Sequence, residues 1–380
     1  MKQGWEIKKL GEVCEVLNGY AFDSNLFTDD NTCVPIIRIR DIKRGYTETF
    51  YKGEYAQEYI INKGNYLIGM DGEFNIAEWS GKDSLLNQRV CKLSVVSSEL
   101  MKRFVLWYMP IALKQIEDET PFVTVKHLSS KKLLNIPIPV PPLPVQERIV
   151  SELDLLSGII EKKREQLKEL DAQAQSMFYD MFGDPITNEK GWEVKKLGEV
   201  CVIERGGSPR PINAFLTDME DGINWIKIGD ATSGSRYITS TKEKIKPEGI
   251  KKSRMVYKGD FILSNSMSFG KPYILGIDGC IHDGWLLLRD NNNTFDKNFL
   301  YYYLTSPNIY LEFKRLAVGG VVNNLNSELV RSVNVAIPPL PLQHQFASKI
   351  EAIERQKELI KQSISETETL FNERMQHYFN

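Results

Sequence analysis

Two stretches of the chain repeat apolar residues at alternating spacings of four and three, the pattern of a heptad seam. The first seam runs through Ile149, Leu153, Leu156, Ile160, Lys163, Leu167 and Leu170 and continues to Met181. The second runs through Phe346, Ile350, Ile353, Lys357, Ile360 and Ile364 and continues to Phe371. Such seams make helices pair, so the pattern predicts a coiled coil; two amphipathic helices packed separately are the alternative. The lysine inside each seam is expected to fix the register of the pair.

The remaining sequence reads as two blocks of short strands separated by turn residues. One helical stretch is expected in each block, over residues 100–117 and 297–317. Strands are expected at 34–42, 64–72, 88–96 and 133–140 in the first block and at 223–230, 259–266, 280–289 and 332–338 in the second. The same order of elements in both blocks indicates a duplicated α+β domain.

Two repeated phrases support the duplication. "GWEIKKLGEV" at 4–13 returns as "GWEVKKLGEV" at 191–200, and "PPLP" followed by "xQ" occurs at 141–146 and again at 338–343. Each "PPLP" lies between a strand and a long helical pattern, where proline ends the strand and opens the helix. A polyproline ligand is the less favoured interpretation. We expect the "GWE" phrase to anchor each block to a long helix.

The order of these segments predicts the arrangement of the chain. The blocks cover residues 1–143 and 184–340, the second opening with a short linker at 184–190, and the helices cover 144–183 and 341–380. At about 1.5 Å per residue the first helix would be a rod of about 50 Å. The second helix can pair with it only by running back, so we expect two mixed α/β domains joined by an antiparallel coiled coil, a dumbbell with a pseudo-two-fold axis.

Composition narrows the functional classes. Hydrophobic residues make up 42% of the 380-residue chain and charged residues 26%, values typical of a soluble globular protein. Five cysteines stand far apart without C-x-x-C spacing, which fits a reducing cytoplasm and no zinc site. There is no leader-like or membrane-spanning apolar run. A net charge of −2 argues against a protein that coats nucleic acid non-specifically, although basic faces remain compatible with it.

The sequence contains no recognisable catalytic motif. Its four histidines lack metal-ligand spacing, and neither a G-x-x-x-x-G-K-[ST] nor a G-x-S-x-G motif is present. We therefore expect a binding protein rather than an enzyme, with no catalytic residue, no metal and no cofactor of its own.

The regions where the two blocks differ combine basic, aromatic and amide side chains. Arginine and lysine hold phosphates and guanine edges, while asparagine and glutamine pair with adenine. The candidates for DNA contact in the first block are Arg38, Arg40, Lys43, Arg44, Tyr46, Asn87, Gln88, Arg89, Thr124 and Lys126. Those in the second block are Lys227, Arg236, Tyr237, Ser264, Asn265, Ser266, Lys271, Asn323 and Asn324.

Taken together, the repeated phrases, the heptad helices and the junction "MFYDMFGDPITNEKGWEVKKLGEV" at 177–200 resemble the specificity subunit of type I restriction-modification systems along essentially the whole chain. The resemblance implies two target-recognition domains that each read one half of a bipartite double-stranded DNA sequence, separated by the coiled coil. It also implies two modification subunits that use S-adenosylmethionine to methylate adenine, and restriction subunits that use ATP and Mg²⁺. Those activities belong to the partners in the cytoplasm.

The family pattern places contacts with the modification subunits on the long helices. Outward positions that could make them are Glu161, Arg164, Lys168, Arg355 and Glu358, although a solvated coil face explains each equally well. Two other functions remain open at this point: a protein scaffold that reads no DNA, and the recognition subunit of an orphan methylation system without restriction.

Overall fold

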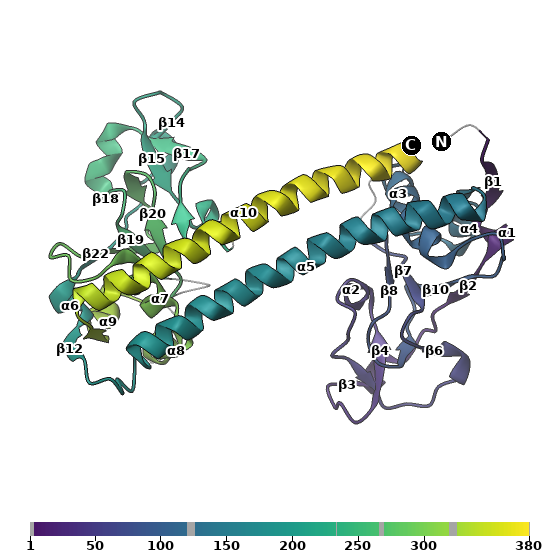
Figure 1. The fold of residues 1–380 in the computed structure, drawn as a ribbon, viewed down its shortest axis with the longest axis horizontal. Coiled ribbons are helices and arrows are strands. Elements are labelled where there is room, and N and C mark those ends of the chain that lie inside the picture. Colours follow the sequence, from purple (N-terminus) through teal and green to yellow (C-terminus); the bar gives the residue numbers. More distant parts are fainter. Residues whose placement is uncertain (1–3, 120–125, 233, 266–269, 319–324, 380) are drawn as a thin grey trace. The chain divides into compact units, whose positions relative to one another are not determined.

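The computed structural model describes residues 4–119, 126–232, 234–265, 270–318 and 325–379. It has two repeated blocks of mixed helices and sheets, and two helices of 40 residues each, α5 (Leu143–Phe182) and α10 (Leu340–Phe379). Two compact units are present, unit 1 with Met1–Lys163 and Gln362–Asn380 and unit 2 with Arg164–Lys361. Each unit thus contains one block and part of each long helix (Figure 1).

Unit 1 contains three sheets with the strand orders β1-β11, β2-β10-β7-β8 and β3-β5-β4-β9-β6. The strands are β1 (Glu6–Lys9), β2 (Cys14–Asn18), β3 (Phe27–Thr28), β4 (Val34–Ile37), β5 (Phe50–Tyr51), β6 (Ile60–Ile61), β7 (Tyr66–Gly69), β8 (Asn75–Glu78), β9 (Ser84–Leu86), β10 (Val90–Val95) and β11 (Pro137–Val140). The helices are α1 (Leu10–Val13), α2 (Ile39–Ile42), α3 (Lys102–Glu119) and α4 (Ser130–Leu134), with short 3₁₀ turns at Ser24–Leu26 and Gln57–Tyr59.

Unit 2 repeats this plan with the orders β12-β23, β13-β22-β19-β20-β16 and β14-β17-β15-β21-β18. The strands are β12 (Glu193–Lys196), β13 (Val202–Arg205), β14 (Leu216–Thr217), β15 (Ile223–Ile226), β16 (Tyr237–Ile238), β17 (Glu243–Ile245), β18 (Arg254–Val256), β19 (Phe261–Ser264), β20 (Pro272–Leu275), β21 (Gly279–Ile281), β22 (Trp285–Arg289) and β23 (Asn334–Ile337). The helices are α6 (Leu197–Val200), α7 (Lys297–Thr305), α8 (Pro307–Val318) and α9 (Ser327–Arg331), with 3₁₀ turns at Ile212–Ala214, Ile228–Asp230 and Pro247–Lys252.

The two units share their sheet connectivity, which confirms the duplication. In each unit a central parallel pair, β4 with β9 or β15 with β21, is flanked by antiparallel strands. Unit 2 has an additional edge strand, β16, which pairs in parallel with β20. The equivalent edge of the unit 1 sheet ends at β8 among the described residues.

Several expected elements differ from the structure. The strand expected over 223–230 ends at Ile226 and is followed by the 3₁₀ turn Ile228–Asp230, and the strand expected over 133–140 begins only at Pro137, after α4. The strand expected over 34–42 ends at Ile37, and α2 follows because the Asp41 carboxylate accepts the Arg38 N–H at 2.9 Å and caps the turn. The strand expected over 280–289 is divided into β21 and β22 by a turn at 282–284. The helix expected over 297–317 is divided at Ser306, whose backbone is extended because the next residue is Pro307.

The long helices pair antiparallel inside each unit, as the seams predicted. In unit 1, Arg374 and Tyr378 near the end of α10 contact Glu152 near the start of α5, while Lys163 donates to Ser363. The last turn of α10 also packs on α3, with Phe379 5.5 Å from Phe104 between ring centroids (Figure 1). The start of α5 therefore lies beside the end of α10, so the two helices run in opposite directions.

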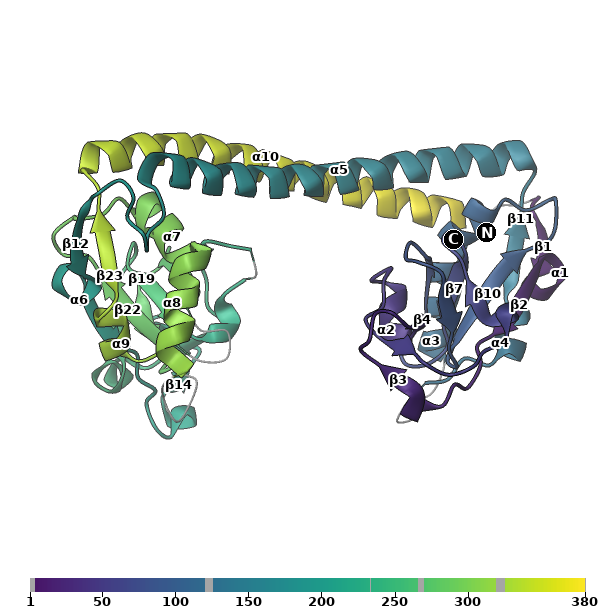
Figure 2. The same ribbon diagram turned by 90° about the horizontal axis from the view of Figure 1, so that it is seen from below.

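In unit 2 the pair is held by an aromatic cluster. Phe178 of α5 lies 5.8 Å from Phe346 of α10 and 5.7 Å from Phe299 of α7, between ring centroids. All three side chains are fully buried, and a buried phenylalanine contributes roughly 1.5–3 kcal/mol. Helix α7 lies directly beneath α10 in Figure 2, so the block and both helices share one core.

The proposed seam positions face inward along both helices. Ile149, Leu153, Leu156 and Ile160 of α5 and Ile350, Ile353 and Lys357 of α10 are buried. Lys163, Leu167, Leu170, Ile360 and Ile364 are half-buried. The buried Lys357 lies 2.6 Å from Asp171 and 3.1 Å from Glu354, so a polar layer fixes the register here.

Each "PPLP-x-Q" segment, which connects a strand to a long helix, ends in a glutamine that is completely buried. The Gln146 side chain accepts the Met101 N–H at 2.8 Å and donates to the Glu99 and Pro141 carbonyls, both at 2.7 Å. Gln343 accepts the Asp296 N–H at 2.8 Å and donates to the Thr294 and Pro338 carbonyls. This glutamine clamp ties the start of α5 to the start of α3, and the start of α10 to the start of α7.

The "GWE" phrases form β1 and β12, which pair with β11 and β23, the strands that lead into α5 and α10. Trp192, in the second phrase, also donates its indole N–H to the Phe182 carbonyl at the end of α5, at 2.8 Å. Gly183 beyond that end has φ +76°, the left-handed conformation of a glycine that ends a helix. No helix among the described residues combines the length and apolar composition needed to cross a membrane.

Candidate nucleic-acid interface

The parallel strand pair of unit 1 brings two candidate segments together. β4 and β9 run side by side with Ile37 opposite Leu86, so both strands end at the same edge of the sheet. Arg38 follows one strand and Asn87 follows the other. Segments about 50 residues apart in sequence therefore meet at a single edge.

These segments enclose a hollow of about 450 Å³. Arg38, Arg40, Gln88 and Arg89 are exposed around it, while Asn87 is 9% exposed. The remaining lining residues are Phe22, Ser24, Phe27 and Ile39. Guanidinium groups and amides around an apolar floor can bind phosphates and the hydrogen-bonding edges of bases. We call this group, Arg38, Arg40, Asn87, Gln88 and Arg89, the unit 1 reading surface.

A buried carboxylate holds one arginine of this surface. Asp71 is 9% exposed and forms an ion pair with Arg89, and its other oxygen lies 2.5 Å from His127 Nδ1. Arg89 has φ +76°, a left-handed conformation that costs a non-glycine residue of order 1 kcal/mol. Its carbonyl accepts the Met70 N–H at 2.9 Å, so the turn is held from both sides.

The other unit 1 candidates lie nearby. Lys43, at the end of α2, forms an exposed ion pair with Glu73 at 2.6 Å, and Arg44 follows it on the surface. Tyr46 is 53% exposed and borders a second hollow that also contains Lys63 and Lys82. Lys126 is half-buried, and its carbonyl accepts the Gly72 N–H at 2.9 Å.

Unit 2 builds the equivalent edge from other residues. Ile226 of β15 lies opposite Ile281 of β21, so Lys227 and His282 follow their strands as Arg38 and Asn87 do. The turn carries His282, Asp283 and Gly284, and its Gly284 carbonyl accepts the Asn265 N–H at 3.0 Å, matching the bond from Met70 to Arg89. Lys227 is half-buried and lies close to Glu243.

Asp283 is the centre of a polar cluster that the sequence did not reveal. Ser208 donates to its carboxylate at 2.8 Å, His282 Nε2 lies 2.8 Å away and Arg210 3.9 Å away. Burial acts to raise the pKa of Asp283, but the Ser208 hydrogen bond and the electrostatic effect of the neighbouring His282 and Arg205 outweigh it, so this pKa lies below its usual value. Alignment of residues 280–284 with residues 85–89 in the repeat identifies Asp283 as the equivalent of Gln88.

The remaining unit 2 candidates divide by exposure. Lys271 and Tyr237 are exposed. Ser264 and Asn265 are buried, and their side chains hold the fold: the Ser264 hydroxyl accepts the Lys271 N–H at 3.0 Å, and the Asn265 amide donates to the Asp283 carbonyl at 2.8 Å. Arg236 is 6% exposed and points to α10. These three placements favour support of the block over direct contact with DNA.

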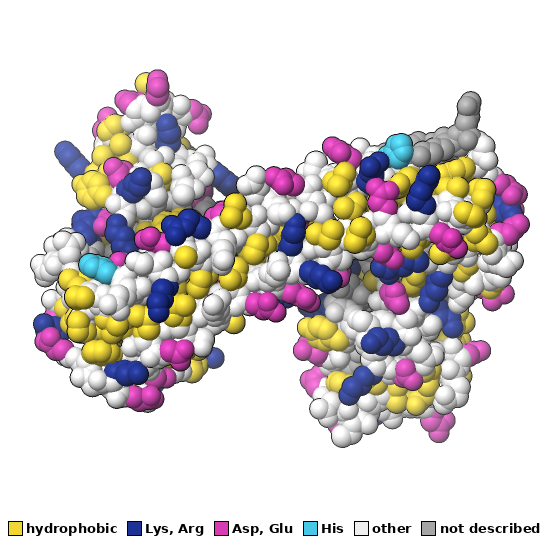
Figure 3. Space-filling view, in the orientation of Figure 1, with side chains coloured by type: hydrophobic (Ala, Val, Ile, Leu, Met, Phe, Trp, Pro, Cys, Tyr) yellow, Lys and Arg dark blue, Asp and Glu magenta, His cyan; other side chains and the backbone are white. Residues whose placement is uncertain are grey.

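Four candidates, Thr124, Ser266, Asn323 and Asn324, lie outside the described residues. The candidates for partner contact, Glu161, Arg164, Lys168, Arg355 and Glu358, all lie on exposed faces of α5 and α10. Basic side chains alternate with acidic ones on the face of each unit shown in Figure 3, in keeping with the small net charge. Among the described residues, no group of histidine, cysteine and carboxylate side chains could hold a metal ion.

A repeated fold whose two units carry different polar groups at the equivalent sheet edge is the arrangement of a duplicated DNA specificity protein. A family model described as "Type I restriction modification DNA specificity domain" matches residues 2–171 and again 189–369, so the chain belongs to this family. Members of the family are generally non-catalytic specificity subunits, and the matching proteins come from bacteria and archaea.

Individual relatives agree with this assignment. The chain is 26% identical over 374 residues to the type I restriction enzyme EcoBI specificity subunit of Escherichia coli, covering 92% of this chain and 79% of that protein. It is 22% identical over 377 residues to the MjaVIII specificity subunit of Methanocaldococcus jannaschii, covering 93% of this chain and 86% of the relative.

Solved structures share the fold. The type I restriction-modification S subunit of M. genitalium matches with a TM-score of 0.56 at 14% identity, covering 98% of this chain and 95% of that one. A chain from a study titled as the structural basis of complex assembly and conformational transition of the type I R-M system matches with a TM-score of 0.56 at 20% identity, covering 100% and 98%.

Proposed function

We propose that this chain is the specificity subunit of a type I restriction-modification complex, and that each unit reads one half of a bipartite DNA target. The unit 1 reading surface is the observation that carries the proposal. Three exposed arginines and two amides meet at the edge of one sheet, where phosphate contacts and base contacts can be made together.

The unit 1 reading surface and the equivalent edge of unit 2 differ in chemistry and therefore favour different half-sites. Unit 1 presents Gln88 and Arg89 on the turn after β9, an amide donor and acceptor beside a cation. Unit 2 presents Asp283 at the position of Gln88, and a carboxylate can only accept hydrogen bonds, as from the amino group of cytosine. The same fold can therefore recognise a different DNA sequence in each unit.

The partners of this chain are part of the same proposal. Two modification subunits dock on the exposed faces of α5 and α10, with Glu161, Arg164, Lys168, Arg355 and Glu358 as candidate contacts. The modification subunits bind S-adenosylmethionine, and restriction subunits supply the ATP-dependent activity with Mg²⁺. This chain contributes target choice in the cytoplasmic complex and no catalytic group.

Replacing Arg38 and Arg40 together with alanine tests the assignment of the unit 1 surface. The chain, in complex with its modification subunit, should bind its DNA target, as identified by selection from a random duplex library, more weakly. Sequence preference should be lost at one half-site and retained at the other. The salt dependence of binding should also become less steep, because fewer phosphate contacts release counterions. Fluorescence anisotropy with duplexes mutated in either half measures both effects.

Lys131 and Lys132, two exposed lysines on α4 of the same unit, provide the matched control. Their replacement with alanine removes the same charge away from the reading surface and should leave the preference of both half-sites unchanged. Equal loss of preference at both half-sites in the Arg38 and Arg40 variant would contradict independent reading by the two units.

A further inference from the structure

In unit 1 one arginine joins three elements. Arg103 of α3 donates from Nε to the Asp154 carboxylate of α5 at 2.8 Å, and its Nη1 lies 3.3 Å from Glu78. Glu78 ends β8, the edge strand of its sheet. Trp107 donates to the same oxygen of Asp154 at 2.9 Å. The guanidinium therefore ties the edge of the sheet, helix α3 and the long helix together.

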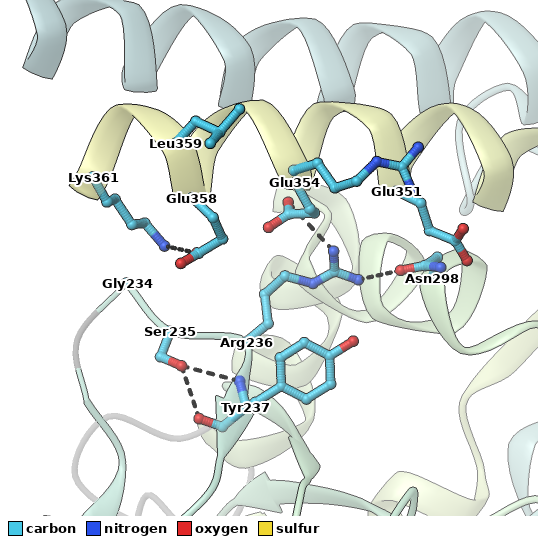
Figure 4. A pocket seen from close by; sticks show the side chains of 11 residues that line it. Gly234, Ser235, Arg236, Tyr237, Asn298, Glu351, Glu354, Glu358, Leu359 and Lys361 are labelled. Carbon is cyan, nitrogen blue, oxygen red and sulfur yellow. Dashed lines mark hydrogen bonds and ion pairs between the residues drawn. The ribbon is translucent and has the colours of Figure 1, made fainter. Parts of the chain in front are cut away.

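In unit 2 an arginine from a different place makes the same connection. Arg236 precedes β16, the edge strand, and its guanidinium reaches Asn298 of α7 at 2.5 Å and Glu354 of α10 at 3.3 Å (Figure 4). The ring of Tyr301 lies 4.5 Å from the guanidinium carbon, which adds a cation–π contact. With 6% of its surface exposed, Arg236 is almost completely enclosed.

The two glutamine clamps provide a common reference for comparing these contacts residue by residue. Arg103 stands two residues after Met101, and Asn298 two residues after Asp296, the residues whose N–H groups bond the clamp glutamines. Asp154 stands eight residues after Gln146, as Glu351 does after Gln343. Asn298 therefore occupies the position of Arg103, and Glu351 that of Asp154. In the second unit the arginine therefore stands just before the edge strand β16 instead of on the helix.

The unit 2 contact extends to both long helices. Glu354 also pairs with Lys357 at 3.1 Å, and Lys357 pairs with Asp171 of α5 at 2.6 Å. Burial lowers the pKa of Lys357, but its hydrogen bond to Asp171 and the charges of Glu354 and Asp171 raise that pKa above its usual value. A chain of ion pairs thus connects the edge strand to α10 and then to α5.

We propose that Arg103 and Arg236 are equivalent positioning residues, each of which fixes the angle at which its recognition block is held on the long helices. This inference rests on the proposed reading of a bipartite target, because the angle of a block determines where its reading surface meets the DNA. No contact joins either arginine to the turn after β9 or β21 among the described residues. Each arginine lies at the edge of the neighbouring sheet, and a strand of that sheet, β10 in unit 1 or β22 in unit 2, begins directly after the turn.

The test measures how strongly the complex discriminates between duplexes with different half-site spacings. A loss of folded protein lowers binding to every duplex equally and leaves this ratio unchanged. The chain with its modification subunit is titrated with duplexes carrying the selected half-sites at the native spacing and with one base pair added or removed. Arg236→Met should lower affinity for the native spacing about tenfold while affecting the altered spacings less, so discrimination between spacings falls. Lys349→Met, an exposed charge on α10, is the matched control and should change neither.

Transplanting the arginine provides the rescue. In the Arg236→Met background, Asn298→Arg should pair with Glu351 as Arg103 pairs with Asp154, because Asn298 and Glu351 line the same hollow and lie beside each other in Figure 4. Spacing discrimination should then return. If Arg236→Met does not fold, Arg103→Met, at a site with 38% side-chain exposure, and Arg236→Lys take its place.

The outcomes separate the inference from the proposed function. Unchanged discrimination between spacings in folded Arg236→Met and Arg103→Met protein would overturn the positioning role. Failure of the unaltered complex to prefer any sequence would instead overturn the proposed function, before any variant is compared.

Discussion

The turns that follow β9 and β21 occupy equivalent positions but carry different charges. In unit 1 the buried Asp71 holds the cation of Arg89 in place, and in unit 2 Asp283 is itself the presented group, held by Ser208 and His282. Preorganised side chains lose less freedom on binding, which favours selective contact with bases. Under the proposed function, the group that each turn orients would set the base preference at this scale.

The cysteines give a prediction for single residues. Burial raises the pKa values of Cys14, Cys91 and Cys201 to about 12 and also raises that of Cys280, whereas Cys33 is only half-buried. Because the thiolate is the reactive form, a thiol reagent at pH 8 should modify Cys33 rapidly and the other four only on unfolding. Mass spectrometry of the timed reaction measures this. Loss of the rapid phase in Cys33→Ser is the control, and rapid modification of Cys14 would contradict the burial.

Residue types alone predicted part of the candidate site. Arg38, Arg40, Gln88 and Arg89 were selected because basic and amide residues stood in divergent segments, and the parallel strands bring them together. Arg236 was selected by the same rule, yet it points to α10, because composition does not encode the direction of a loop side chain. Asp283 does not stand out by residue type, because a carboxylate is not among the basic and amide groups expected to contact DNA; only its alignment with Gln88 in the repeat indicates it.

At the scale of elements, the glutamine clamps explain why "PPLP-x-Q" occurs twice. A buried amide with three backbone partners holds the first turn of each long helix against the block helix that precedes it. The heptad spacing predicted the long helices within a residue or two, since periodic burial is encoded locally. The break at Ser306 was missed because it depends on one proline inside an otherwise helical pattern.

Replacing Gln146 or Gln343 with alanine should destabilise the protein by roughly 2–3 kcal/mol, because buried backbone groups lose their hydrogen-bond partners. Thermal or urea unfolding followed by circular dichroism measures the change. Gln345→Ala, at an exposed position of α10, is the control and should stay within about 0.5 kcal/mol of the unaltered protein. A clamp variant as stable as this control would show that the bonds contribute little.

For the whole molecule, duplication explains how one chain offers two readings. Sheet connectivity, glutamine clamps and strand pairs with the "GWE" phrases are repeated, so each block is mounted on the long helices in the same way. The turns that follow β9 and β21 differ in charge and hydrogen-bonding groups. The sequence predicted this duplication because the mounting residues are nearly identical, whereas the bases recognised depend on side-chain geometry that no short motif records.

The most direct test of the central claim is selection from a randomised duplex library by the chain in complex with its modification subunit, followed by sequencing of the bound DNA. Two short motifs separated by an unread spacer of fixed length should be enriched, with one motif degraded by the Arg38 and Arg40 replacement. Enrichment of one continuous motif, or of none, would contradict the account that two units each read half of the target.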